Sequence, residues 1–150
     1  MRLEGVNQTA LFEVIGYEFP QARNDEWDDN WLMLYGETII NGLEVKGTAA
    51  AFTTFELSEL IKELDSYQNG EIPVLGWCGT EYPNFHIDIT EQGILEIFFC
   101  PHKAEKNFWE IKTFKNFKKT VTDSDIDSIR KFCISTLKKF PYRGEIKNME

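Results

Sequence analysis

The dipeptide Asn41-Gly42 is the feature that most constrains the fold, because it lies between two apolar runs and marks a tight β-hairpin. The run before it is NWLMLYGETII (30–40), and the run after it is LEVKGTAAAFTTF (43–55). An earlier strand-forming segment is TALFEVIGYEF (9–19). Together the three segments predict an antiparallel meander in the N-terminal third of the chain.

A helix is predicted directly after the third segment. Thr53 and Glu56 have the spacing of a capping box, in which each side chain binds the backbone N–H of the other residue. Apolar residues recur at i, i+3, i+4 and i+7, which places them on one face of a helix. The pattern predicts a helix over about 54–68, packed on the sheet through Leu57, Leu60, Ile61 and Leu64.

Short alternating segments in the second half of the chain predict three or four further strands, at 73–79, 84–90, 94–100 and 108–117. A second helix is predicted over about 123–140, where Thr122 caps the start and Pro141 ends the apolar stripe. We therefore expect the α+β class, with the order βββ-α-βββ(β)-α and one antiparallel β-sheet of six or seven strands.

The length of 150 residues suits a single hydrophobic core, and no linker rich in Pro, Gly or Ser divides the chain. We expect one domain over residues 1–150. The residues from about 143 to 150 lack apolar periodicity and are expected to fray. The cysteines are odd in number and far apart, which favours free thiols at Cys78, Cys100 and Cys133.

The net charge of −9 is unevenly distributed along the chain. Residues 1–100 carry 4 Lys and Arg against 18 Asp and Glu, whereas residues 101–150 carry 12 against 7. The acidic first two thirds disfavour direct nucleic-acid binding and favour the steering of a basic partner. No apolar run is long enough to span a bilayer, and the N-terminus does not resemble a signal peptide. We expect a cytoplasmic protein without a membrane partner.

Catalytic and metal-binding motifs are weak in this sequence. His86 and Asp88 share one strand face, which suits a small hydrolase and suits a solvated polar face equally well. Cys100 and His102 supply two of the four ligands that zinc prefers. The segment 102–119 interleaves lysines with aromatic residues, as single-stranded nucleic-acid binders and plain amphipathic strands both do. We expect no catalytic residue, no metal, no cofactor and no enzymatic activity.

The stretch NDEWDDNWL (24–32) places four carboxylates and two tryptophans within nine residues. The carboxylates lack the alternation and the glycine of a calcium-binding loop. Trp31 is expected to begin a buried strand. Trp27 is expected to be exposed, and exposed tryptophan is enriched at binding hot spots. We interpret this stretch as a partner-binding surface formed by Asp25, Glu26, Trp27, Asp28 and Asp29.

Four segments of the chain together resemble the WapI family of bacterial immunity proteins. They are VIGYEFP (14–20), DDNWLMLYGE (28–37), FTTFELSELIKEL (52–64) and EYPNFHIDI (81–89). The resemblance implies a small cytoplasmic antitoxin without catalytic residues. Such a protein binds and neutralises the C-terminal domain of a polymorphic toxin, often a nuclease. The matching residues look structural and supply no binding site; they include Gly16, Tyr17, Pro20, Asn30, Trp31 and Leu32.

The sequence leaves three functions open. The leading hypothesis is toxin neutralisation, in which the acidic body of this chain meets a basic surface of the toxin domain. The first alternative is a metal-dependent or otherwise uncharacterised small hydrolase that uses His86 and Asp88. The second is a structural protein of an oligomer, with an aromatic patch as the contact. The sequence does not fix the oligomeric state.

Overall fold

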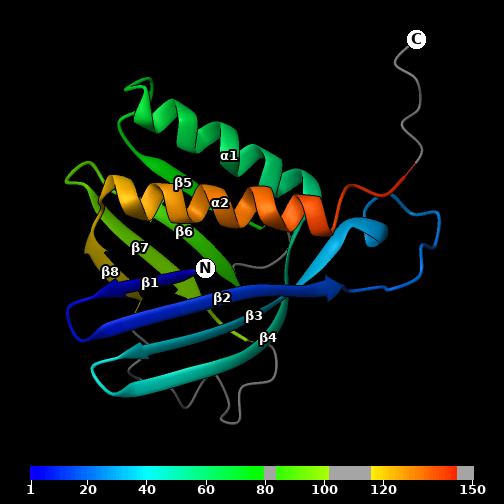
Figure 1. Cartoon of the computed structure of the whole chain (residues 1–150), viewed down its shortest axis with the longest axis horizontal. Helices are drawn as coiled ribbons and strands as arrows, with labels where there is room; N and C mark the ends of the chain where they lie inside the picture. The colour runs from blue at the N-terminus through cyan, green and yellow to red at the C-terminus, as the bar shows by residue number, and fades with distance from the viewer. Residues whose placement is uncertain (80–83, 102–115, 145–150) are drawn as a thin grey trace.

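The computed structural model describes residues 1–79, 84–101 and 116–144, and eight strands and two α-helices lie in these ranges (Figure 1). The strands form two antiparallel sheets of four strands each. The α+β class predicted from the sequence is therefore confirmed. No helix within the described ranges is long and apolar enough to cross a membrane.

The first sheet is built from the N-terminal third of the chain in chain order. Its strands are β1 (Arg2–Gly5), β2 (Gln8–Tyr17), β3 (Trp31–Ile40) and β4 (Leu43–Thr53). The predicted hairpin at Asn41 and Gly42 joins β3 to β4 and is confirmed. Both turn residues have positive φ, at 50° and 83°, which Asn tolerates and which Gly adopts without steric cost.

The second sheet also follows chain order. Its strands are β5 (Leu75–Cys78), β6 (Phe85–Ile89), β7 (Ile94–Phe99) and β8 (Phe117–Thr120). The helix α1 (Thr54–Gln68) connects the two sheets, and α2 (Asp123–Lys139) follows β8. Both helices begin with a complete capping box, one formed by Thr53 with Glu56 and one by Thr122 with Asp125.

The strand count differs from the expected single sheet of six or seven strands, because eight strands divide between two sheets. Gly79, just after β5, packs against the backbone of β4, where an added Cβ would lie 2.1 Å from the carbonyl oxygen of Ala51. The additional strand β1 reaches β2 through a turn in which Asn7 has a φ of 53°. A strand was expected at 108–117; residues 108–115 lie outside the described ranges, and β8 begins at Phe117.

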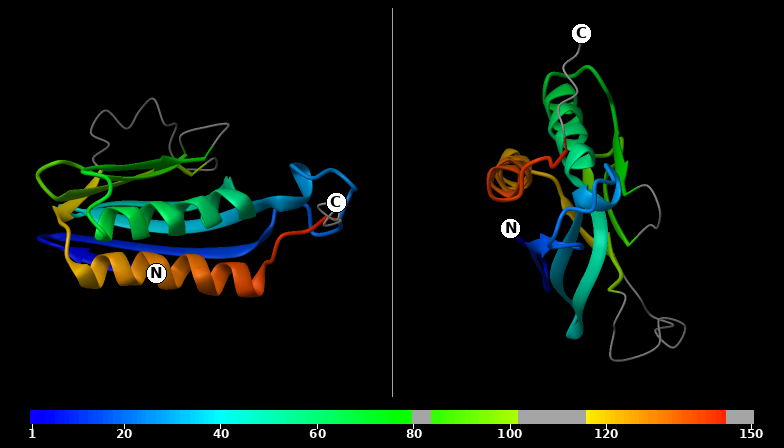
Figure 2. Two further views of the ribbon diagram at one scale, coloured as in Figure 1. Left: turned by 90° about the horizontal axis from the view of Figure 1, so that it is seen from above. Right: turned by 90° about the vertical axis from the view of Figure 1, so that its right-hand side faces the viewer.

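The two sheets form separate layers (Figure 2). Side chains from both sheets and from both helices make the core. Phe12 of β2 bridges the layers, because its ring centroid lies 4.9 Å from that of Phe85 and 5.4 Å from that of Phe99. Both pairs are edge-to-face, a favourable geometry for aromatic rings. Gly36 on β3 has no side chain, and the rings of Phe12 and Phe99 fill the space beside it.

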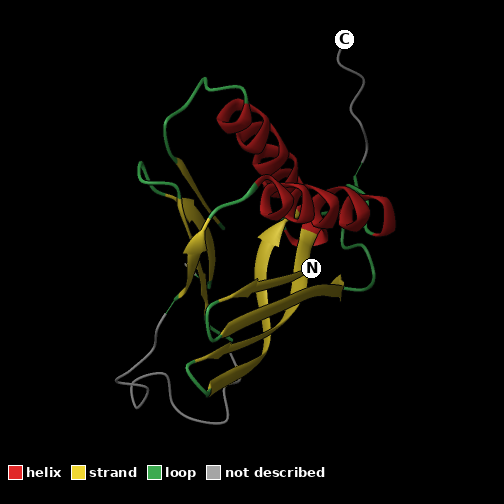
Figure 3. Ribbon diagram, turned by 60° about the vertical axis from the view of Figure 1, so that its left-hand side comes forward, coloured by secondary structure: helices red, strands yellow, loops and turns green. Residues whose placement is uncertain are grey.

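The two helices contact each other, and the side chain of Gln8 connects the two sheets. α1 and α2 lie side by side (Figure 3), and Arg130 of α2 forms an ion pair of 2.9 Å with Asp65 of α1. At the start of β2, the amide of Gln8 donates to the carbonyl of Lys118 at 3.0 Å and accepts from its N–H at 2.8 Å. This side chain therefore joins β2 to β8 as a strand backbone would. The other end of β2 leads into the loop that carries the candidate site.

Candidate partner-binding surface

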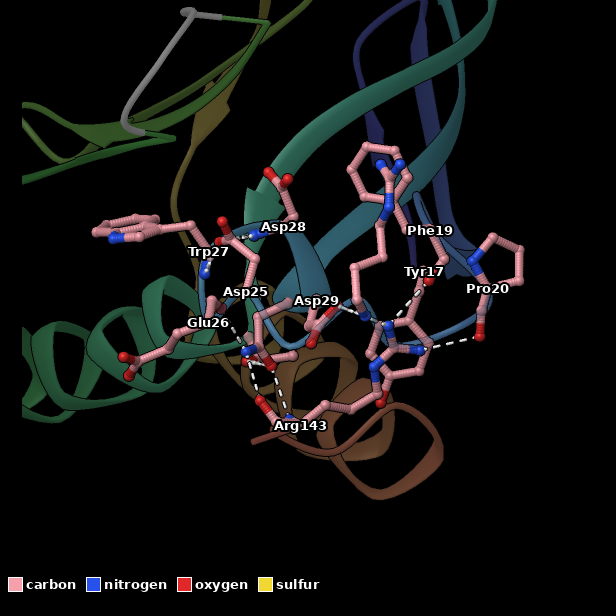
Figure 4. A network of polar contacts seen from close by, with 12 residues as sticks. Tyr17, Phe19, Pro20, Asp25, Glu26, Trp27, Asp28, Asp29 and Arg143 are labelled. Atoms are coloured by element: carbon pink, nitrogen blue, oxygen red, sulfur yellow. Dashed lines mark hydrogen bonds and ion pairs between the residues drawn. The ribbon is translucent and has the colours of Figure 1, made fainter. Parts of the chain in front are cut away.

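The loop between β2 and β3 (18–30) carries all five residues of the predicted surface and ends in the short 3-10 helix η1 (Asp28–Asn30) (Figure 4). Asp25 shapes the turn, because its Oδ1 accepts hydrogen bonds from the N–H groups of Trp27 and Asp28, both at 3.0 Å. The N–H of Asp29 donates to the carbonyl of Asp25 at 2.8 Å. Asp25 thus fixes the loop while remaining exposed to solvent.

Asp29 points inward, unlike the other four residues. It is only 3% exposed, and its Oδ1 accepts a 2.6 Å hydrogen bond from the N–H of Arg23. The same oxygen lies 3.7 Å from Nη2 of Arg143, which comes from the segment that follows α2. The carboxylate of Asp29 therefore holds the loop together and is buried.

Asn30 is buried beneath the loop and connects three parts of the chain. Its Nδ2 donates to the carbonyls of Glu26 at 2.7 Å and Arg143 at 2.8 Å. Its Oδ1 accepts from the hydroxyl of Thr54 at 2.9 Å and from the N–H of Arg143 at 2.8 Å. The side-chain amide therefore joins the loop, the first residue of α1 and the C-terminal segment.

The exposed side of the loop combines aromatic rings with carboxylates. Trp27 is 54% exposed, as the sequence predicts, and its ring stands edge-on to that of Phe55 with centroids 5.1 Å apart. The ring of Phe55 lies 6.1 Å from that of Tyr142, whose hydroxyl donates to Oε1 of Glu26 at 2.9 Å. This hydrogen bond raises the pKa of Tyr142. We call this group the acidic aromatic surface; its members are Asp25, Glu26, Trp27, Asp28, Phe55 and Tyr142.

Sequence reasoning missed Phe55, Tyr142 and Arg143 at this site. Phe55 lies at the start of α1, and the other two lie just after α2, so only the tertiary fold brings them to the loop. Arg143 falls in the tail expected to fray, yet it is packed against the loop, and residues 145–150 lie outside the described ranges. Pro141, which predicted the end of α2, was the only local signal for this change of chain direction.

A shallow hollow of about 450 Å³ lies along the first limb of the loop, which we define as residues 19–23. It is lined by Phe19, Pro20, Gln21, Ala22 and Arg23. The guanidinium of Arg23 lies 4.7 Å above the ring centroid of Phe19, which is a cation–π arrangement. This limb is cationic and apolar, so it differs in character from the acidic aromatic surface.

His86 and Asp88, the residues of the hydrolase hypothesis, lie on β6. Asp88 is paired in register with Glu96 of β7. Burial raises the pKa of Asp88; the nearby His86 lowers it and Glu96 raises it. Within the described residues, no group of three or more His, Cys, Asp or Glu side chains could hold a metal ion. His102, the proposed partner of Cys100, lies outside the described ranges.

The three cysteines are free thiols, as expected. Most of the lysine-rich segment (102–119) lies outside the described residues. Its last two lysines form ion pairs, Lys118 with Glu96 at 3.5 Å and Lys119 with Asp125 at 3.0 Å. These two ion pairs join β8 to β7 and to α2.

The model of the immunity protein WapI-like family matches residues 3–141. The chain therefore belongs to the WapI-like family of immunity proteins, as its resemblance implied. Comparisons with curated proteins and with solved structures gave no match. The match covers both helices, the loop 18–30 and nearly all of both sheets. Five members of the acidic aromatic surface therefore lie within the matched region, and Tyr142 follows directly after it.

Proposed function

We propose that this protein binds and neutralises a cognate bacterial toxin domain through the acidic aromatic surface. The family supports a role in toxin immunity. The observation that carries the choice of surface is Trp27, whose ring is half exposed beside the carboxylates of Glu26 and Asp28. Trp and Tyr are the residues that most often dominate binding energy at interfaces.

The charge of the surface indicates the kind of partner. A nuclease binds a polyanion, so its active site is basic and attracts carboxylates. Glu26 and Asp28 would steer such a toxin domain onto the loop, and Trp27 and Tyr142 would then be buried in the contact. Neutralisation by occupancy needs one immunity protein for each toxin and no catalytic step. We place this action in the cytoplasm, where a nuclease meets its substrate.

Co-expression with the cognate toxin domain, sought first in the neighbouring reading frame, tests the proposal. We expect cells to survive with the wild-type chain and the two purified proteins to bind with 1:1 stoichiometry in calorimetry. Trp27→Ala should reduce survival. Ile15→Ala is the matched control, because Ile15 is also 54% exposed but lies on the outer face of β2. Equal cell death with and without the wild-type chain would refute the function, and equal survival of the two variants would refute the surface.

A further inference from the structure

The C-terminal segment (141–144) leaves the end of α2 and runs back against the loop 18–30. We infer that Arg143 is a positioning residue, which holds this loop in the conformation that presents the acidic aromatic surface. The inference rests on the proposed function for its effect on binding. The effect of Arg143 on the loop itself can be measured in the free protein.

The backbone of Arg143 is paired with a side chain from the loop. Its N–H donates to Oδ1 of Asn30 and its carbonyl accepts from Nδ2 of Asn30, both at 2.8 Å. Asn30 also binds the carbonyl of Glu26 at 2.7 Å. Through this one amide, the position of the C-terminal segment sets the position of Glu26, which belongs to the acidic aromatic surface.

The guanidinium of Arg143 reaches the opposite limb of the loop (Figure 4). Nη1 donates to the carbonyl of Pro20 at 3.1 Å, and Nη2 donates to that of Phe19 at 2.9 Å. Nη2 also lies 3.7 Å from the buried carboxylate of Asp29. The guanidinium carbon lies 3.9 Å above the ring centroid of Tyr17. One side chain therefore binds the beginning of the loop, its end and the strand before it.

This arrangement uses properties that lysine lacks. The planar fork of arginine donates to two carbonyls at once and stacks on an aromatic ring, whereas lysine offers a single point charge. A long loop held at both limbs loses less conformational entropy when a partner binds, which favours a tighter complex. In Figure 4, Trp27 and Asp28 point away from Arg143, so Arg143 acts on the surface from behind and need not touch the partner.

Hydrogen exchange and binding together test the inference. In Arg143→Ala we expect backbone exchange in residues 19–29 to accelerate about tenfold or more, while exchange in the central strands β3 and β6 stays unchanged. Affinity for the toxin domain should fall about tenfold or more. Arg143→Lys keeps the charge and the backbone pairing with Asn30 but not the fork, so both effects should be intermediate.

Arg130→Ala is the matched control. The Arg130 side chain is 21% exposed, close to the 18% of Arg143, and it bridges α2 to α1 away from the loop. We expect this variant to leave loop exchange and toxin affinity unchanged. If Arg143→Ala does not fold, the comparison of Arg143→Lys with Arg130→Lys carries the test.

Two outcomes would overturn the inference. Unchanged exchange in residues 19–29 of the Arg143 variants would show that Arg143 does not hold the loop. Faster exchange with unchanged toxin affinity would show that the loop conformation does not matter for binding. Neither outcome bears on toxin neutralisation itself, which fails if the wild-type chain does not bind the toxin domain and protect cells.

Discussion

Gly36 and Phe99 lie so close across the sandwich that a Cβ built on Gly36 would be 2.7 Å from Cε1 of Phe99. The same Cβ would lie 2.9 Å from the ring of Phe12. These rings are packed on each other in the core, so neither can move freely. We expect Gly36→Ala to lower the free energy of unfolding by about 1–3 kcal/mol through overpacking. Urea unfolding followed by tryptophan fluorescence measures it.

Gly16→Ala is the control for this prediction, because a Cβ on Gly16 would meet nothing within 4 Å. It should change the free energy of unfolding by no more than about 0.5 kcal/mol, as surface substitutions usually do. A similar loss of stability in both variants would mean that the sheets are packed less tightly at Gly36 than these distances indicate.

Charge reversal at the loop tests the steering of a basic partner. We expect the double variant Glu26→Lys/Asp28→Lys to lower the association rate constant with the toxin domain about tenfold at low salt, and to flatten its salt dependence. Asp25 and Asp29 are left intact, since their carboxylates bind backbone N–H groups of the loop. Stopped-flow fluorescence at several salt concentrations gives the rate constants.

Glu71→Lys/Glu91→Lys is the matched control for charge reversal. It makes the same change in net charge at two exposed positions outside the loop, one after α1 and one in the turn between β6 and β7. Equal rate constants for the two double variants would show that net charge, and not the acidic aromatic surface, steers association.

Asp88 gives a prediction for the pH dependence of stability. Burial raises its pKa in the folded state above the ordinary value of 3.8. The folded state therefore binds this proton more tightly than the unfolded state does. Its stabilising contribution is present below the unfolded pKa and is lost as the pH rises through the folded pKa. Asp88→Asn should therefore be more stable than the wild type at pH 7, with a difference that shrinks towards pH 3.5. Urea unfolding at both pH values measures this. A less stable Asp88→Asn at pH 7 would indicate that the carboxylate binds a cation or His86.

Thiol labelling tests the packing of α2. Burial raises the pKa of Cys133 to about 12, so the thiol stays protonated at pH 8. Cys78 is exposed, and burial raises the pKa of Cys100. We expect iodoacetamide at pH 8 to modify Cys78 first and Cys133 only in denaturant, as peptide mass spectrometry would show. Rapid labelling of Cys133 in native buffer would contradict the packing of α2 on the core.

Features that depend on neighbouring residues were predictable from the sequence. The capping box of Thr53 and Glu56 gave the start of α1, and the Asn41-Gly42 turn gave the hairpin. The burial of Trp31 and the exposure of Trp27 were also predicted correctly, because one belongs to an apolar run and the other lies among carboxylates. The role of Trp27 in binding stays a prediction.

Features that depend on distant residues were not predictable. No local pattern shows that a strand ladder ends at β4, since that ending depends on α1 and on the contact of Gly79 with Ala51. The contact of Asp29 with Arg143 and the ring contact of Trp27 with Phe55 each join residues that lie far apart in the chain. In each case the partner is remote in sequence, and a single sequence carries no signal for such pairs.

The pairing of every strand with a chain neighbour has a consequence for the rate of folding. Among the described residues, the order of strands in both sheets equals their order in the chain. Sandwiches fold slowly when their ladders join remote segments, because a large loop must close before any contact forms. Here each hairpin closes a modest loop, and residues 100–116 between β7 and β8 are the longest link within a sheet. We therefore expect each sheet to form from local hairpins, and the chain to fold faster than sandwiches with interleaved strands.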